Sequence, residues 1–82
     1  MFDALKNAPC RAVGAKQVLR AISGGTAQKV YLAQDVEDYL SEKVLSACRE
    51  AGVEAERCGS MKELGKACGI EVQAACAAIL RL

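Results

Sequence analysis

The sequence predicts an α/β fold, a single small domain built as a three-layer α/β/α sandwich around a central four-stranded mixed sheet. Helical and extended patterns alternate along the 82 residues, which indicates a sheet with helices on both faces. The last segment, residues 73–82, is almost continuously apolar and predicts a strand that is buried on both faces in the centre of the sheet. Hydrophobic residues make up 52% of the chain, which is enough for one core.

Four elements are predicted in the first half of the chain. They are a short helix, an extended segment, a longer helix and a strand, over residues 2–7, 11–13, 14–23 and 29–33. The longer helix has Val18, Leu19 and Ile22 on one face, and Gly24 and Gly25 close it. The strand, KVYLA, is rich in residues that favour β-structure.

The second half predicts a long helix, a strand, a small helix and the final strand. After the long helix, these elements cover residues 53–58, 61–68 and 73–82. The long helix is expected to begin at an N-cap, either Asp35 or Asp38, and to end before Gly52.

The small helix has the clearest local signals in the chain. Ser60 and Glu63 have the spacing of a capping box, in which each side chain accepts a hydrogen bond from the backbone of the other residue. Gly69 suits the left-handed position just past a helix end. Ile70 and Val72 follow at once, so an apolar loop is expected directly after the helix.

Charge is distributed unevenly along a chain whose net charge is only +1. Residues 1–29 contain five bases and one acid, residues 30–56 contain two bases and seven acids, and residues 57–82 contain four bases and two acids. If the two ends of the chain meet in space, the molecule has a basic side and an acidic side. A basic side suits a polyanion; the alternative is scattered solvated charge.

The composition argues against an enzyme, a metal centre and a cofactor. The chain has no His, so the usual general base is missing. Its five cysteines are odd in number and form no C-x-x-C pair, which does not favour zinc. Cys48, Cys68 and Cys76 lie among apolar or small residues and are expected in the core. Free thiols, with no signal peptide and no membrane-spanning run, predict a reducing, cytoplasmic location.

A binding surface is predicted where the second helix begins. The segment GAKQVLR, residues 14–20, opens a helix directly after an extended segment, so its free N–H groups and positive dipole end favour phosphate. Lys16 and Gln17 lie in the first turn and can contact base edges. Arg20 follows Lys16 at i+4 and suits a phosphate. The alternative is an ordinary solvated helix face.

Three segments together resemble the L-seven-Ae family of ribosomal proteins. They are GAKQVLR, LAQDV and SMKELGKACGIEV, and the match is closest to the small bacterial branch of that family. The resemblance covers nearly the whole chain. It implies an α/β/α domain over residues 1–82 that binds kink-turns, RNA elements in which tandem sheared G·A pairs and a bulge bend a duplex sharply. The kink opens a major groove that is otherwise too narrow to read.

The resemblance also implies which residues would bind RNA. It places Gly14, Lys16, Gln17 and Arg20 on the motif that enters the groove at the G·A pairs. Archaeal and eukaryotic members have Asn and Glu where this chain has Lys16 and Gln17, and the bacterial branch resembles Lys-Gln. This difference replaces a carboxylate acceptor with a neutral amide and adds a cation.

The remaining implied contacts surround the bulge. Ile70, Glu71 and Val72 fall on a loop that covers the bulged nucleotides. Lys62 lies near a position that contacts the RNA backbone or the flipped-out base, and Glu37 matches an acidic position beside the flipped nucleotide.

The sequence therefore predicts a non-enzymatic, monomeric RNA-binding protein that stabilises kink-turns as a ribosomal-protein-like or ribonucleoprotein component. Its partner would be a structured RNA (ribosomal RNA, a riboswitch or another non-coding RNA), with the ribosome as a further partner. Two alternatives stay open. One is a structural ribosomal subunit acting mainly through protein contacts of the acidic helix near residues 35–56. The other is a thiol- or metal-responsive protein.

Overall fold

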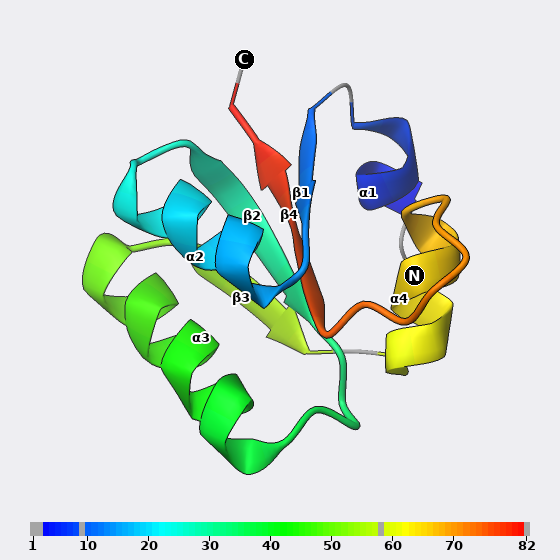
Figure 1. Cartoon of the computed structure of the whole chain (residues 1–82). Helices are drawn as coiled ribbons and strands as arrows, with labels where there is room; N and C mark the ends of the chain where they lie inside the picture. The colour runs from blue at the N-terminus through cyan, green and yellow to red at the C-terminus, as the bar shows by residue number, and fades with distance from the viewer. Residues whose placement is uncertain (1–2, 9, 58, 82) are drawn as a thin grey trace.

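The computed structural model describes residues 3–8, 10–57 and 59–81, which form a four-stranded sheet with helices on both faces (Figure 1). In chain order the elements are α1 (Asp3–Asn7), β1 (Arg11–Val13), α2 (Ala15–Ser23), β2 (Ala27–Leu32), α3 (Asp38–Ala51), β3 (Glu54–Arg57), α4 (Met61–Ala67) and β4 (Cys76–Leu80). Helices α2 and α3 pack together on one face, and α1 and α4 lie on the other (Figure 1). This arrangement confirms the predicted three-layer α/β/α sandwich.

The strand order is β1-β4-β2-β3, so the last strand lies inside the sheet, as its apolar sequence predicts. Strand β4 runs antiparallel to β1 and β2, whereas β2 and β3 are parallel, and the sheet is therefore mixed. Three consecutive residues of β4, Cys76, Ala77 and Ala78, are each fully buried. Their small side chains allow helices to approach both faces of this strand.

Most of the connecting segments lie at one end of the strands of the sheet. Strands β1, β2 and β3 all end there, and β4 begins there, because β4 is antiparallel to its two neighbours. Backbone hydrogen bonds join the segments: the Gly14 N–H donates to Cys76 O at 2.9 Å, and the Ala33 N–H donates to Ala75 O at 3.0 Å. We call this region the loop edge and define it as residues 14–17, 33–37, 59–60 and 68–75.

Helix ends follow the local signals in the sequence. The Ser60–Glu63 capping box is present, with the Glu63 N–H donating to Ser60 Oγ at 3.1 Å and the Ser60 N–H donating to Glu63 Oε1 at 3.0 Å. Gly69 has φ +75° and follows the end of α4, and its N–H donates to Lys66 O at 3.0 Å. The capping box and the glycine stop are both confirmed.

The predicted start of α3 is wrong. Neither Asp35 nor Asp38 is the N-cap: Glu37 holds that position without a side-chain cap, and Asp38 is the first helical residue. The Oδ1 of Asp35 instead accepts a hydrogen bond at 2.8 Å from the N–H of Met61 in α4. Val36 is 6% exposed, so the chain first turns this residue into the core and begins the helix afterwards.

Strand β4 is shorter than predicted. It covers Cys76–Leu80 rather than residues 73–82, because the preceding segment lies against α4, where the Ala74 N–H donates to Met61 O at 3.0 Å. The outermost predicted strand residues Cys58 and Leu82 lie outside the described residues. No helix in the described part of the chain has the length and apolar character needed to cross a bilayer.

Candidate nucleic-acid interface

The N-terminus of α2 is open at the loop edge. Gly14 has φ +94°, a conformation that side-chain-bearing residues rarely adopt, and it is the N-cap of α2 without a side chain to cap the helix. A Cβ atom at Gly14 would meet nothing within 4 Å, so the space beside its Cα is open. Lys16 and Gln17 are exposed in the first turn. The first-turn amides are left without a side-chain cap and can take an external acceptor.

The N-terminus of α4 lies at the same edge but is closed. Ser60 and Glu63 cap each other, and Asp35 accepts the N–H of Met61. These carboxylates and the hydroxyl occupy the amides that an anion would otherwise contact. The two helix ends therefore have different roles: α2 presents donors to solvent, whereas α4 uses its donors to fix its own position.

A loop over residues 70–74 is held on α4 and carries exposed apolar surface. The Ile70 N–H donates to Gly65 O at 3.1 Å, and the Ala74 N–H donates to Met61 O at 3.0 Å. Between these anchors, the side chain of Val72 is 70% exposed. Ile70 is half-buried and packs against the core, so Val72 is the apolar side chain that this loop exposes.

The structure brings four predicted residues together beside this loop. A hollow of about 700 Å³ is lined by Lys62, Lys66, Ile70, Glu71, Val72 and Gln73. The sequence interpretation missed Lys66 and Gln73. The i, i+4 spacing of Lys62 and Lys66 on one helix was the signal that would have identified Lys66.

Arg20 and Glu37 are placed differently from this group. Arg20 lies one turn after Lys16 and lines a hollow between α2 and α3 together with Lys43 and Glu50. Glu37 is exposed at the loop edge, at the start of α3. The predicted residues thus divide into a start-of-α2 group, a loop group beside α4, and two separate positions.

The two ends of the chain meet, which was the condition for a basic side. Strand β1 pairs with β4, so the basic first third and the basic last third of the sequence are neighbours in the sheet. The acidic middle third supplies α3 and the edge strand β3. The charge separation across the sheet is incomplete, because Arg57 lies in β3 and Lys29 in β2 forms an ion pair with Glu56 of β3 at 3.5 Å.

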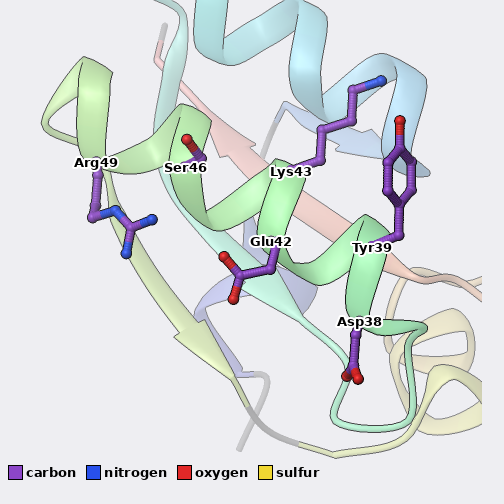
Figure 2. Close-up of a pocket in the computed structure, with 6 residues that line it drawn as sticks. All are labelled: Asp38, Tyr39, Glu42, Lys43, Ser46 and Arg49. Carbon is purple, nitrogen blue, oxygen red and sulfur yellow. The ribbon is translucent and has the colours of Figure 1, made fainter.

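A separate shallow hollow lies on the outer surface of α3 (Figure 2). It is lined by Asp38, Tyr39, Glu42, Lys43, Ser46 and Arg49. Tyr39 is 76% exposed, and it points with Lys43 to the opposite side of the helix from Glu42 and Arg49 (Figure 2). The hollow has two acids and two bases and includes no residue of the predicted interface.

The described cysteines are free, and three of them belong to the core. Cys10 is exposed, whereas Cys48, Cys68 and Cys76 are buried, as predicted. Burial raises the pKa of the Cys48 and Cys68 thiols and raises the pKa of Cys76 to about 11. Over residues 3–8, 10–57 and 59–81, no group of three or more Cys, Asp or Glu side chains is arranged to hold a metal ion.

These features define a small α/β/α binding protein whose candidate ligand surface is the loop edge of its sheet. The model of the ribosomal protein L7Ae/L30e/S12e/Gadd45 family matches residues 4–81, and the chain belongs to this family. This membership confirms the resemblance identified from the sequence, and it agrees with the prediction that the chain is not an enzyme.

Several relatives are named as RNA-binding proteins. One from Caldanaerobacter subterraneus subsp. tengcongensis is 46% identical over 70 residues, which is 85% of each chain. RNA-binding protein YbxF of Geobacillus stearothermophilus is 48% identical over 69 residues, which is 84% of each chain.

Two solved structures are similar in fold. The Giardia lamblia 15.5 kD RNA binding protein has a TM-score of 0.80 and 30% identity, and the match covers 96% of this chain and 65% of that one. A protein with unknown function from Bacillus halodurans has a TM-score of 0.81 over 87% of this chain and 71% of that one. At 22% identity, the second similarity concerns the fold alone.

Proposed function

We propose that this protein binds RNA at the loop edge and stabilises kink-turns. The observation that carries the proposal is that an uncapped helix N-terminus with Lys16 and Gln17 shares one sheet edge with a loop that exposes Val72. In open α/β sheets, ligands bind outside the carboxyl ends of the strands, and three strands end at this edge. The family and the names of its members support RNA as the ligand.

Each part of the edge has a proposed role. Lys16 donates to guanine O6 and N7, and Gln17 donates and accepts at base edges of the G·A pairs. Arg20 holds a phosphate farther along the groove and positions the duplex without reading sequence.

The loop beside α4 covers the bulge. Val72, which is otherwise exposed to water, packs on unstacked bases, and the exposed part of Ile70 extends this contact. Lys62 and Lys66 neutralise phosphate on one side of the hollow, and Glu71 lies on its other wall. Glu37, at the start of α3, accepts from the flipped nucleotide.

Stabilisation follows from preferential binding. A free kink-turn RNA samples bent and extended forms, and a protein that binds only the bent form shifts the population toward it. A fivefold to 150-fold shift needs about 1–3 kcal/mol of differential affinity, which a few charge-assisted contacts supply. The natural RNA in this proposal is ribosomal RNA, a riboswitch or another non-coding RNA.

A gel-shift with two RNAs tests the proposal. A minimal kink-turn is compared with the same RNA in which Watson–Crick pairs replace the G·A pairs, both at physiological salt. We expect preferential binding to the kink-turn, and equal binding to the two RNAs would contradict the proposal. Lys16→Ala should reduce that preference. Lys6→Ala is the matched control, because Lys6 is an exposed lysine of α1 and lies outside the residues that form the loop edge.

A second candidate function is protein docking through the outer surface of α3. The observation that favours it is Tyr39, which is 76% exposed beside acidic residues of the helix. Tyrosine is enriched at protein interfaces because it buries a large area at low entropic cost. Co-sedimentation with ribosomes in high salt, lost in Tyr39→Ser but kept in Lys16→Ala, would favour this function over RNA binding.

A further inference from the structure

We propose that Gly65 is a positioning residue for the RNA-covering loop, because its missing side chain lets residues 70–74 lie directly on α4. The inference rests on the proposed function and adds a residue that does not itself touch RNA. It concerns the contact between one helical glycine and the backbone of the loop.

The first observation is that glycine is not needed at position 65 for backbone conformation. Gly65 lies inside α4 and is not among the described glycines with positive φ, unlike Gly69 four residues later. Glycine inside a helix lowers helix stability relative to alanine. The residue therefore needs a reason that lies outside its own helix.

The second observation supplies that reason. A Cβ atom at Gly65 would overlap the carbonyl oxygen of Val72 and come within 3.2 Å of its carbonyl carbon and 3.3 Å of the Ala74 nitrogen. All three atoms belong to the loop backbone, so no side-chain rotation can relieve the overlap. The loop itself would have to move.

The third observation is that this contact lies between the two anchors of the loop. The Ile70 N–H donates to Gly65 O, and the Ala74 N–H donates to Met61 O. The carbonyl of Val72 faces α4 between them, while its side chain is 70% exposed. Moving the carbonyl away from α4 therefore moves the exposed side chain that is proposed to cover the bulge.

The first experiment compares Gly65→Ala with Gly52→Ala. Gly52 has φ +68° and nothing within 4 Å of a built Cβ, so its substitution strains the backbone at the far end of α3 without displacing the loop. In Gly65→Ala, amide hydrogen exchange of residues 70 and 74 in the free protein should become faster. In Gly52→Ala, these two amides should be unchanged relative to the rest of the protein.

The RNA measurement separates positioning from general destabilisation. Gly65→Ala should bind a minimal kink-turn about 10- to 100-fold more weakly, which corresponds to about 1.4–2.8 kcal/mol. For a kink-turn with abasic bulge nucleotides, the variant and the unchanged protein should bind equally, because the bases under the loop are absent. Faster loop exchange with unchanged affinity for the intact kink-turn would overturn the proposal, as would unchanged loop exchange.

A second variant covers the case in which Gly65→Ala does not fold. Inserting one glycine after Gln73 lengthens the loop and adds no atom to α4. We expect the same loss of affinity from this insertion alone. In a double variant that folds, Gly65→Ala should cause no further loss of RNA affinity, because the inserted glycine has already released the loop from α4. Full affinity in the insertion variant would overturn the proposal.

The failure of the proposed function would look different. If the unchanged protein showed no preference for the kink-turn, RNA recognition of this kind would be wrong, yet the exchange rates of the free variants would still report the Gly65 contact. A kink-turn preference in the unchanged protein, with weaker kink-turn binding and faster loop exchange in Gly65→Ala but not in Gly52→Ala, supports both proposals.

Discussion

The hydrogen bond from the N–H of Met61 to Asp35 Oδ1 at 2.8 Å leads to a quantitative prediction. Asp35 precedes α3 in the sequence, yet its carboxylate lies at the N-terminus of α4, 26 residues away. Replacing Asp35 by alanine removes the acceptor for a first-turn amide and also removes a negative charge from the positive end of the helix dipole. Replacing it by asparagine keeps an oxygen acceptor and removes only the charge.

The expected magnitude follows from these two contributions. Loss of a capping acceptor costs about 0.5–2 kcal/mol, typically near 1. Loss of a favourable charge in the first turn costs about 0.3–1 kcal/mol. Asp35→Ala should therefore lower the free energy of unfolding by about 1–2 kcal/mol, and Asp35→Asn by about 0.3–1 kcal/mol. For a domain of this size, 1 kcal/mol corresponds to about 4–8 °C in Tm.

Urea unfolding at pH 7, followed by circular dichroism, measures the effect. Asp38→Ala is the matched control, because Asp38 is an exposed acid in the first turn of α3 at a helix end that has no side-chain cap. Asp38→Ala should lower the free energy of unfolding only by the charge contribution, about 0.3–1 kcal/mol. If Asp35→Ala and Asp38→Ala unfolded at the same urea concentration, the hydrogen bond to Met61 would contribute nothing to stability, and the reasoning would be refuted.

Three further predictions concern RNA and the thiols. Lys16→Ala should lose about 1–3 kcal/mol of binding free energy and relax the preference for G·A pairs. Arg20→Ala should mainly reduce the slope of log affinity against log salt by about 0.7–0.9, the value for one phosphate contact. If the two variants behaved alike, these separate roles would be contradicted. In a Cys58→Ser background at pH 8, a disulfide reagent should modify Cys10 rapidly and the three buried thiols only on unfolding, and one common rate for all four would argue against this. Because burial raises the folded pKa of Cys76 from the ordinary 9.0 to about 11, the stability due to its protonated form is complete below pH 9 and is lost as pH rises through 11; pH-dependent unfolding of Cys76→Ala should lack this loss, and an identical profile would disprove it.

The sequence predicted well those features that depend on neighbouring residues. The Ser60–Glu63 capping box and the Gly69 stop need only a few consecutive side chains, and both are present. The central place of β4 follows from a run of small apolar residues that can only be stable when both faces are covered. In each case the local preference and the final structure agree.

The features that the sequence missed depend on contacts between distant segments. The position of Asp35 in the sequence suits an N-cap of α3. Because the next residue, Val36, is buried, the carboxylate of Asp35 lies at α4 instead. The last strand begins late because Ala74 hydrogen-bonds to Met61 before the chain enters the sheet. Gly65 looks like a weak point in a helix until the path of the loop over it is known.

The two helices that begin at the loop edge are capped differently, and this difference matches the two roles proposed for them. Helices α2 and α4 both begin at this edge, and each has first-turn amides that need acceptors. The sequence satisfies those of α4 internally with Ser60, Glu63 and Asp35. It leaves those of α2 behind Gly14, which has no side chain that could serve.

A fixed α4 is what a covering loop requires, because residues 70–74 take their position from its backbone. An open α2 is what a reading helix requires, because its amides and the side chains of Lys16 and Gln17 must reach an external acceptor. If a serine replaced Gly14, it would both strain the backbone at φ +94° and supply a cap that competes with the ligand. Under the proposed function, glycine at one helix start leaves α2 open for binding, and serine at the other fixes α4 as the support of the loop.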